Sequence, residues 1–204
     1  GGGPGGGGGG PPDGGPAGPA DLSLGAPSEG FSAAVEEEAN ACFQRVYTAA
    51  LSVDDLASLL HSYKGSGDAH QQEVYACIVH NLFEEYRYFP KYPDRFLHTT
   101  ALLFGALIQH ELVSSITLGM FLRYVLEALR KLPGSKMFSF GALALSQFKW
   151  RVPEWPQYCA QVLALPHLRS AHPELVAMIE GMRDGRAASA MPPPPTLGPP
   201  PNLA

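Results

Sequence analysis

The chain has 204 residues, of which 43 are Gly or Pro, and 17 of the first 20 positions carry one of these two residues. Segments of this composition lack the apolar side chains that offset the entropy of ordering the backbone. We therefore expect disordered Gly/Pro-rich linkers over 1–30 and 187–204 and one folded module over 31–186. Glycine shows no three-residue period, which excludes collagen, and three cysteines are too few for a disulfide scaffold.

The charge of the predicted module argues against a nucleic-acid-binding surface. All 14 Lys and Arg residues and 16 of the 19 acidic residues lie within 31–186, which gives this segment a formal net charge of −2. Nucleic-acid-binding proteins usually carry a cationic excess, because neutralising phosphates supplies much of their affinity. The longest apolar run, 101–108, is also far shorter than the roughly 20 residues needed to span a bilayer.

Apolar residues recur at helical spacing through the middle of the chain. The first stripe advances by 4, 3, 4 and 3 residues, which is typical of a helix face that packs on a core; it consists of Val35, Ala39, Cys42, Val46 and Ala49. Similar stripes predict helices over 52–63, 75–89, 94–108, 113–131 and 138–150, with short helices after Pro153, Pro156 and Pro173. Ser52 is expected to cap the second of these helices.

The number and spacing of these helices predict an all-α fold. Seven or eight helices joined by short Gly or Pro turns favour a HEAT-type α-solenoid of antiparallel pairs. The pairs would begin near Val35, Gln71 and Val113, about 36 and 42 residues apart. A compact helical bundle would show similar stripes and stays open as an alternative at this point.

Motifs for catalysis or metal binding are incomplete in this sequence. His110-Glu111 begins a zinc-protease pattern, but Ser114 stands where the second histidine is required. The cysteines Cys42, Cys77 and Cys159 are isolated and lie in apolar stripes, which indicates buried structural residues. We therefore predict a protein that is not an enzyme and needs no cofactor or metal.

A second apolar stripe on the first helix is the strongest functional signal. Asn40, Phe43 and Tyr47 follow one another by 3 and 4 residues, about 100° around the helix from the core stripe. Such a stripe either lines a groove for an amphipathic peptide helix or packs on a neighbouring helix. Glu85 is either solvated or paired with a basic partner, and Tyr92 is either a loop plug or an exposed contact.

Three longer segments resemble a known family. They are NLFEEYRYFPKYPD at 81–94, LRYVLEALRK at 122–131 and GSKM at 134–137. They are similar to the large scaffold subunit of the CCR-NOT deadenylase complex, over its HEAT-repeat module. The similarity extends from about Glu38 to Cys159 and includes neither Gly/Pro-rich flank.

The resemblance implies a tethering function. In animal relatives the module binds a short C-terminal helix of tristetraprolin, a zinc-finger protein bound to AU-rich mRNA. The matched positions imply a partner-peptide site, with Glu85 pairing with a peptide Arg and Asn40 bonding the peptide backbone; the site consists of Asn40, Phe43, Tyr47, Glu85 and Tyr92.

The implied role is recruitment of the deadenylase for mRNA decay and translational repression. Other CCR-NOT subunits would bind elsewhere on a longer scaffold, and neither direct nucleic-acid binding nor membrane association is expected. The implied locations are the cytoplasm, including P-bodies, and the nucleus. The alternatives are a HEAT module that binds RNA directly or a structural spacer within the scaffold.

We predict that single-stranded RNA does not bind the chain with micromolar affinity, because the module carries a net negative charge. Filter binding across a salt series checks this expectation. Tight binding that falls steeply with salt would instead favour the RNA-binding alternative.

Overall fold

The computed structural model describes residues 30–186 and 191–203, so the predicted N-terminal linker lies outside the described residues except for Gly30. The described part contains nine α-helices, two 3-10 helices and no strand. The helices are α1 (Ala33–Tyr47), α2 (Val53–Lys64), α3 (Ala69–Glu85), η1 (Tyr86–Lys91), α4 (Asp94–Gln109), α5 (Ser115–Leu129), α6 (Lys136–Phe148), η2 (Lys149–Glu154), α7 (Pro156–Leu163), α8 (Pro166–Ala171) and α9 (Pro173–Arg183).

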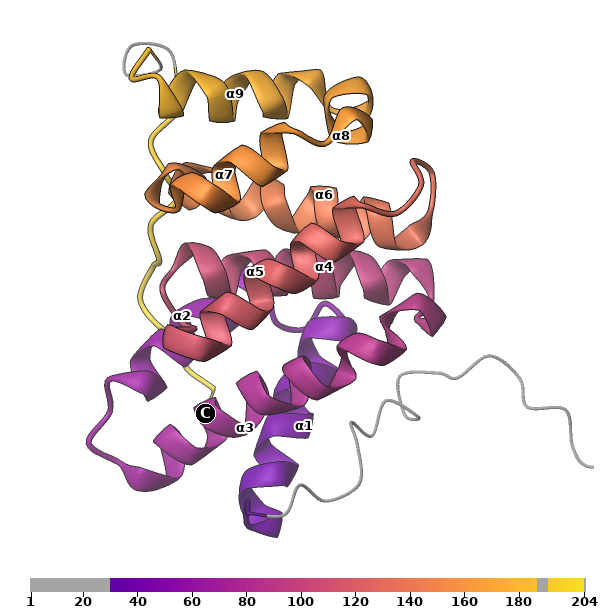
Figure 1. Cartoon of the computed structure of the whole chain (residues 1–204). Helices are drawn as coiled ribbons and strands as arrows, with labels where there is room; N and C mark the ends of the chain where they lie inside the picture. The colour runs from indigo at the N-terminus through magenta and orange to yellow at the C-terminus, as the bar shows by residue number, and fades with distance from the viewer. Residues whose placement is uncertain (1–29, 187–190, 204) are drawn as a thin grey trace, which may run out of the picture.

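The helices stack in the manner of a solenoid (Figure 1). Helices two apart in the chain lie side by side: α1 packs on α3, α2 on α4, and α4 on α6. Contacts between α2 and α3 and between α5 and α6 join the two layers, and the short helices α7, α8 and α9 extend the stack beyond η2. The predicted all-α, solenoid-like architecture is therefore confirmed.

Helix starts follow the capping rules. Ser52 Oγ accepts a hydrogen bond from the Asp55 backbone N–H at 3.0 Å, as predicted, and Ser32 and Ser135 cap α1 and α6 in the same way. Each hydroxyl satisfies one of the N–H groups that a first helical turn leaves without a partner.

The helix count and several helix boundaries differ from the sequence-based expectation: α3 begins at Ala69, six residues before the predicted start, and Pro153 lies inside η2 and does not precede a helix of its own. The described residues form nine α-helices, whereas seven or eight were predicted. One of the additional helices is α8, which starts at Pro166, where no helix was predicted. The stripe over 75–89 is also not one helix: α3 ends at Glu85 and η1 follows, with Pro90 inside it. Proline lacks the backbone N–H that a continuing α-helix requires, so the chain tightens before it.

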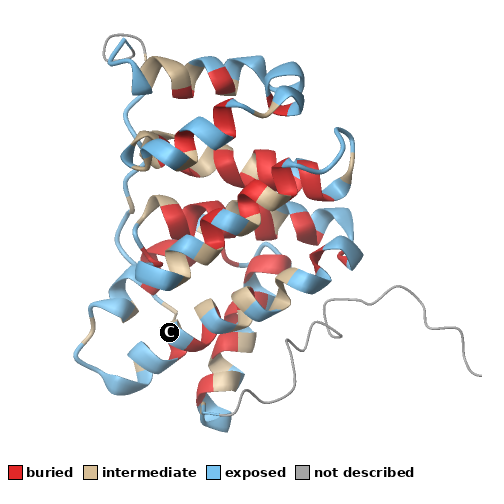
Figure 2. Cartoon of the chain, viewed as in Figure 1, coloured by how far each residue is buried: buried red, intermediate tan, exposed pale blue. Residues whose placement is uncertain are grey.

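Burial follows the apolar stripes (Figure 2). Phe104 of α4 is fully buried and stacks on Phe121 of α5, with ring centroids 4.1 Å apart. The rings of Phe89 and Phe140 also lie near the Phe104 ring, with centroid separations of 6.2 and 5.5 Å. Ala49 is the exception among the residues assigned to the first stripe: it lies beyond α1 in a turn, exposed and with a φ of 61°.

The segment over 187–204, for which we expected a Pro-rich linker, is described in part. Residues 187–190 and 204 lie outside the described part, but 191–203 form an extended segment with no helix or strand. Leu197 and Leu203 are half-buried and pack against the core of the module. Figure 1 shows this segment, in yellow, following one edge of the stack from α9 toward the level of α2 and α3. We call it the C-terminal strap.

Two glycines allow the central helices to approach one another closely. A Cβ on Gly105 of α4 would overlap the Ala144 carbonyl oxygen of α6 and lie 2.6 Å from Gln147 Cβ. A Cβ on Gly141 of α6 would lie 3.0 Å from the Leu129 backbone nitrogen of α5. Helix α6 is therefore in near backbone contact with both α4 and α5.

We predict opposite effects of the same substitution at two helical glycines. Gly105→Ala should lower the free energy of unfolding by about 1–3 kcal/mol, because a methyl group would force α4 away from α6. Gly119→Ala, at an exposed position of α5 with open space around it, should raise it by about 0.5–1 kcal/mol through helix propensity. Urea denaturation followed by circular dichroism measures both, and equal stability of the two variants would contradict the close packing.

Candidate peptide-binding site

The first helix uses both of its apolar stripes. Val35, Ala39, Cys42 and Val46 are buried, as the first stripe predicts. The second stripe is buried as well, with Phe43 2% exposed and Tyr47 5% exposed. The two rings of the second stripe lie 6.3 Å apart in a stacked arrangement. In this structure the two rings therefore pack on neighbouring helices, which is one of the two interpretations of the stripe.

Tyr47 is fixed to helix α4 by a buried hydrogen bond. Its hydroxyl lies 2.7 Å from Thr100 Oγ1, and Thr100 in turn donates to the Phe96 carbonyl oxygen. Because the threonine proton is used in that bond, the Tyr47 hydroxyl is the donor between the two side chains. The Tyr47 ring also meets the Phe96 ring edge-on at 5.4 Å.

Glu85 and Tyr92 form a second pair near Tyr47. The Tyr92 hydroxyl donates to Glu85 Oε2 at 2.8 Å, and Tyr92 is 5% exposed with its ring 5.2 Å from Phe89. Tyr92 is thus a plug in the loop after η1, which is one of its two sequence interpretations. Glu85, expected to be solvated or paired with a base, instead accepts from a tyrosine at a half-buried position.

The predicted site residues therefore fall into two groups. Tyr47, Glu85 and Tyr92 form one group, in which Tyr92 donates to Glu85. Burial raises the pKa of both tyrosines, and the charge of the nearby Glu85 adds a smaller effect in the same direction. Asn40 and Phe43 extend from Tyr47 toward the start of α1. Since the three rings are almost completely covered, they could contact a peptide only through their exposed edges.

Asn40 has an unusual environment for an amide. Its Oδ1 atom is buried and accepts no hydrogen bond from the described residues. A buried acceptor without a partner costs about 1–3 kcal/mol, so such groups are rare in folded proteins. A donor from an incoming chain would remove this cost if the neighbouring side chains moved aside.

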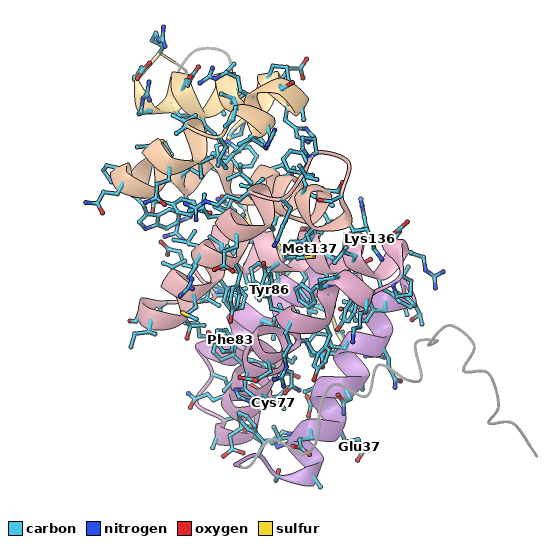
Figure 3. The ribbon with its side chains drawn as sticks, turned by 45° about the vertical axis from the view of Figure 1, so that its right-hand side comes forward. Glu37, Cys77, Phe83, Tyr86, Lys136 and Met137 are labelled. Carbon is cyan, nitrogen blue, oxygen red and sulfur yellow. The ribbon has the colours of Figure 1, made fainter. Side chains whose placement is uncertain are left out.

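Lys136 is a residue of this region that sequence reasoning missed. Its Nζ donates to the Tyr92 carbonyl oxygen and lies 3.4 Å from Asp94 Oδ1. Figure 3 labels Lys136 at the start of α6, at the edge of the stack. It belongs to a segment that sequence analysis matched to the family without assigning it a role, and only the packing of α6 on α4 brings it to the Tyr92 loop, 44 residues away in sequence.

A surface cavity adjoins this lysine. It has a volume of about 320 Å³ and lies between α4 and the start of α6. Its lining combines apolar and polar groups; among them are Leu97, Ala101, Phe140, Leu143, His98 and Asp94. Because Lys136 also bonds Tyr92, the cavity lies next to the Tyr92 loop, and a short peptide side chain could enter it.

Metal-ligating residue types are scattered in the described part of the chain. No group of three or more His, Cys, Asp or Glu residues lies close enough there to hold a metal ion. The cysteines are buried and unpaired, as predicted, and burial raises the pKa of the Cys42 thiol to about 11. A thiol of this pKa is a poor nucleophile at neutral pH. No helix in this part of the chain is long and apolar enough to cross a membrane.

These features define a small all-α, solenoid-like module in which buried aromatic rings of α1, α4 and the loop after η1 lie beside the carboxylate of Glu85. The family model for the CCR4-NOT transcription complex subunit 1 TTP binding domain matches residues 21–190. The chain belongs to this family, which confirms the resemblance found in the sequence.

Individual relatives agree with this family assignment. The chain is 41% identical over 152 residues to General negative regulator of transcription subunit 1 of Schizosaccharomyces pombe, covering 74% of this chain and 7% of the relative. It is 35% identical over 136 residues to CCR4-NOT transcription complex subunit let-711 of Caenorhabditis elegans, covering 66% of this chain and 5% of that protein. The chain therefore spans only a small part of the length of these relatives.

A solved structure supports the fold independently. The N-terminal domain of the yeast Not1 superposes with a TM-score of 0.71 at 29% identity, over 81% of this chain and 33% of that chain. The helical stack is thus shared with a protein of the same family.

We predict a loss of stability at alkaline pH that depends on Tyr47. Burial raises its pKa from 10.0 to about 12, so the unfolded state loses the proton first as the pH rises. The contribution of the protonated Tyr47 hydroxyl to the free energy of unfolding is complete below about pH 10 and is lost between about pH 10 and 12. Between pH 9 and pH 11, Tyr47 alone should lower the free energy of unfolding by about 1 kcal/mol.

Urea denaturation at several pH values measures this dependence. Tyr47→Phe should flatten the decline, whereas Tyr88→Phe, at a ring that is 42% exposed, serves as the matched control. An unchanged slope in the Tyr47 variant would show that its hydroxyl is not buried as the structure places it.

Proposed function

We propose that the module binds a short amphipathic helix of an mRNA-bound regulator of the tristetraprolin type. The chain's membership of a TTP-binding domain family supports this function, and the Asn40 acceptor without a partner is the structural observation that carries it. Such a peptide would lie over Phe43, Tyr47 and Tyr92 and place a donor at Asn40. Its binding would be modest, because the free peptide must first fold.

Glu85 supplies the charge for this interaction. Its Oε2 accepts from Tyr92, and a carboxylate can accept further hydrogen bonds at its remaining lone pairs. An arginine of the peptide would form a charge-assisted bond there, which is stronger than a bond between neutral groups. Lys136 lies on the other side of the Tyr92 loop and would favour an acidic group nearby, so the site would orient a peptide of mixed charge.

At the level of the full scaffold, the same interaction would recruit a deadenylase to the message. The module would act without catalysis, as a tether between an RNA-bound regulator and subunits held elsewhere on the longer protein. This would promote mRNA decay and translational repression in the cytoplasm, including P-bodies, and in the nucleus.

The charge of Glu85 can be tested without disturbing the fold. Glu85→Gln keeps an oxygen that can accept from Tyr92 but removes the charge, so we expect about tenfold weaker binding of an amphipathic, Arg-containing regulator peptide, equivalent to about 1.4 kcal/mol. Glu84→Gln makes the same change at the exposed neighbouring residue and should leave the affinity unchanged. Fluorescence anisotropy with a labelled peptide measures both, and equal affinities of the two variants would exclude Glu85 from the site.

Asn40→Ala separates binding from stability. Because its acceptor is unsatisfied in the free module, the variant should be at least as stable as the wild type, yet bind the peptide several-fold more weakly. Phe43→Ala is less informative, since removing a ring that is 2% exposed should itself cost about 3–5 kcal/mol. Unchanged affinity in a folded Asn40 variant would contradict the proposed backbone contact.

A further inference from the structure

The beginning of the C-terminal strap borders a pocket of the module. The pocket has a volume of about 400 Å³ and forms between η2 and the end of α9. Its module side is lined by Trp150, Pro153, Met182 and Gly185, and the strap supplies Met191 and the prolines of 192–194. The pocket therefore has an aromatic and apolar side from the module and a proline-rich side from the strap.

Trp150 gives this contact a polar component as well. Its indole Nε1–H donates to the Pro192 carbonyl oxygen at 3.4 Å, a long hydrogen bond at an exposed position. Proline has no backbone N–H, so the carbonyl oxygens are the only backbone groups that a proline run offers to a partner. Grooves that bind proline-rich segments use this combination of aromatic surface and donors, because such a run is already extended and loses little entropy on binding.

The platform that carries Trp150 is held rigidly. Arg151, whose side chain is only 12% exposed, donates to the Ile108 carbonyl oxygen at 2.5 Å and pairs with Glu154 at 2.9 Å. Its guanidinium also lies 4.9 Å from the Trp155 ring centroid, and Val152 is fully buried. These contacts fix η2 between α4 and the end of the stack, so the indole is in place before a ligand arrives.

One side of the indole is covered by a cation. Lys149 Nζ lies 3.7 Å from the Trp150 ring centroid, a cation–π distance, and donates to the Ser146 carbonyl oxygen. A basic residue beside the ring suits a neutral or acidic proline-rich segment and disfavours a basic one. The strap fits this requirement, since residues 191–203 carry no charged side chain.

The remainder of the strap strengthens the contact by adding apolar anchors. Leu197 and Leu203 are half-buried against the core, while the prolines of 192–195 are exposed. Because the strap belongs to the same chain, its effective concentration at the pocket is in the millimolar range or higher. It would therefore exclude weak ligands that arrive from solution.

We propose that Trp150, Pro153 and Met182 form a polyproline-binding site, to which the chain's own 191–194 segment is docked through the bond between Trp150 and Pro192. When the strap is displaced, the site takes a proline-rich, uncharged segment of another protein. This site lies on η2 and α9 and shares no residue with the proposed regulator site on α1, the end of α3 and the loop after η1.

The test compares the full chain with a variant that carries Pro192→Ala, Pro193→Ala and Pro194→Ala together. The chain has two tryptophans, so its two indole N–H resonances can be followed by nuclear magnetic resonance and assigned with Trp150→Phe. We expect the triple substitution to shift the Trp150 resonance and to leave that of Trp155 in place.

A synthetic peptide of residues 191–197 then serves as the probe. Added to the triple variant, it should return the Trp150 resonance toward its wild-type position, with a half-saturating concentration at least tenfold lower than in the wild-type chain, where the strap competes. A peptide with alanine in place of its prolines should have no effect. Glu85→Gln should leave this titration unchanged, which separates the result from the regulator site.

Two outcomes would overturn the proposal. The first is a Trp150 resonance that is the same in the wild-type chain and the triple variant. The second is binding of a fluorescently labelled 191–197 peptide, followed by anisotropy because the Trp150 resonance is then absent, that persists with equal affinity after Trp150→Phe in the triple variant. Phenylalanine keeps an aromatic ring but removes the donor, which should weaken binding at least several-fold.

Discussion

The near contact between α4 and α6 is the constraint on which the module depends. It is possible because Gly105 presents no Cβ to the α6 backbone. At this separation Phe104 can stack on Phe121 and also reach Phe89 and Phe140. Each such ring contributes about 1.5–3 kcal/mol when it is withdrawn from water, so this cluster is a large part of the stability of a domain of this size.

The same cluster positions the proposed regulator site. Phe89 of η1 is buried against Phe104 and Phe140, and this fixes the loop in which Tyr92 donates to Glu85. From the other side, Thr100 of α4 holds Tyr47 of α1. The site therefore lies directly on the core, and its aromatic residues serve stability first and could contribute to recognition only through their exposed edges. This is why polar groups at the margin are the sharper probes of binding.

The two proposed sites lie on different helices of one stack. The regulator site uses α1, the end of α3 and the loop after η1, whereas the polyproline site uses η2 and the end of α9. Both take extended or helical segments that would be unfolded before binding, and neither requires the module to change its fold. A module built in this way would bring separate chains together through short segments, which agrees with a tethering role in a longer scaffold.

The amino-acid sequence by itself determined the helical fold, most helix starts and the family, because apolar periodicity, serine caps and prolines act over a few residues. It also placed Asn40, Phe43 and Tyr47 on one helix face. It did not decide whether that face is core or groove, nor that Glu85 pairs with Tyr92, because burial is set by neighbours distant in the chain. Lys136 and the docked strap likewise depend on contacts over more than 40 residues, so only the tertiary structure decided them.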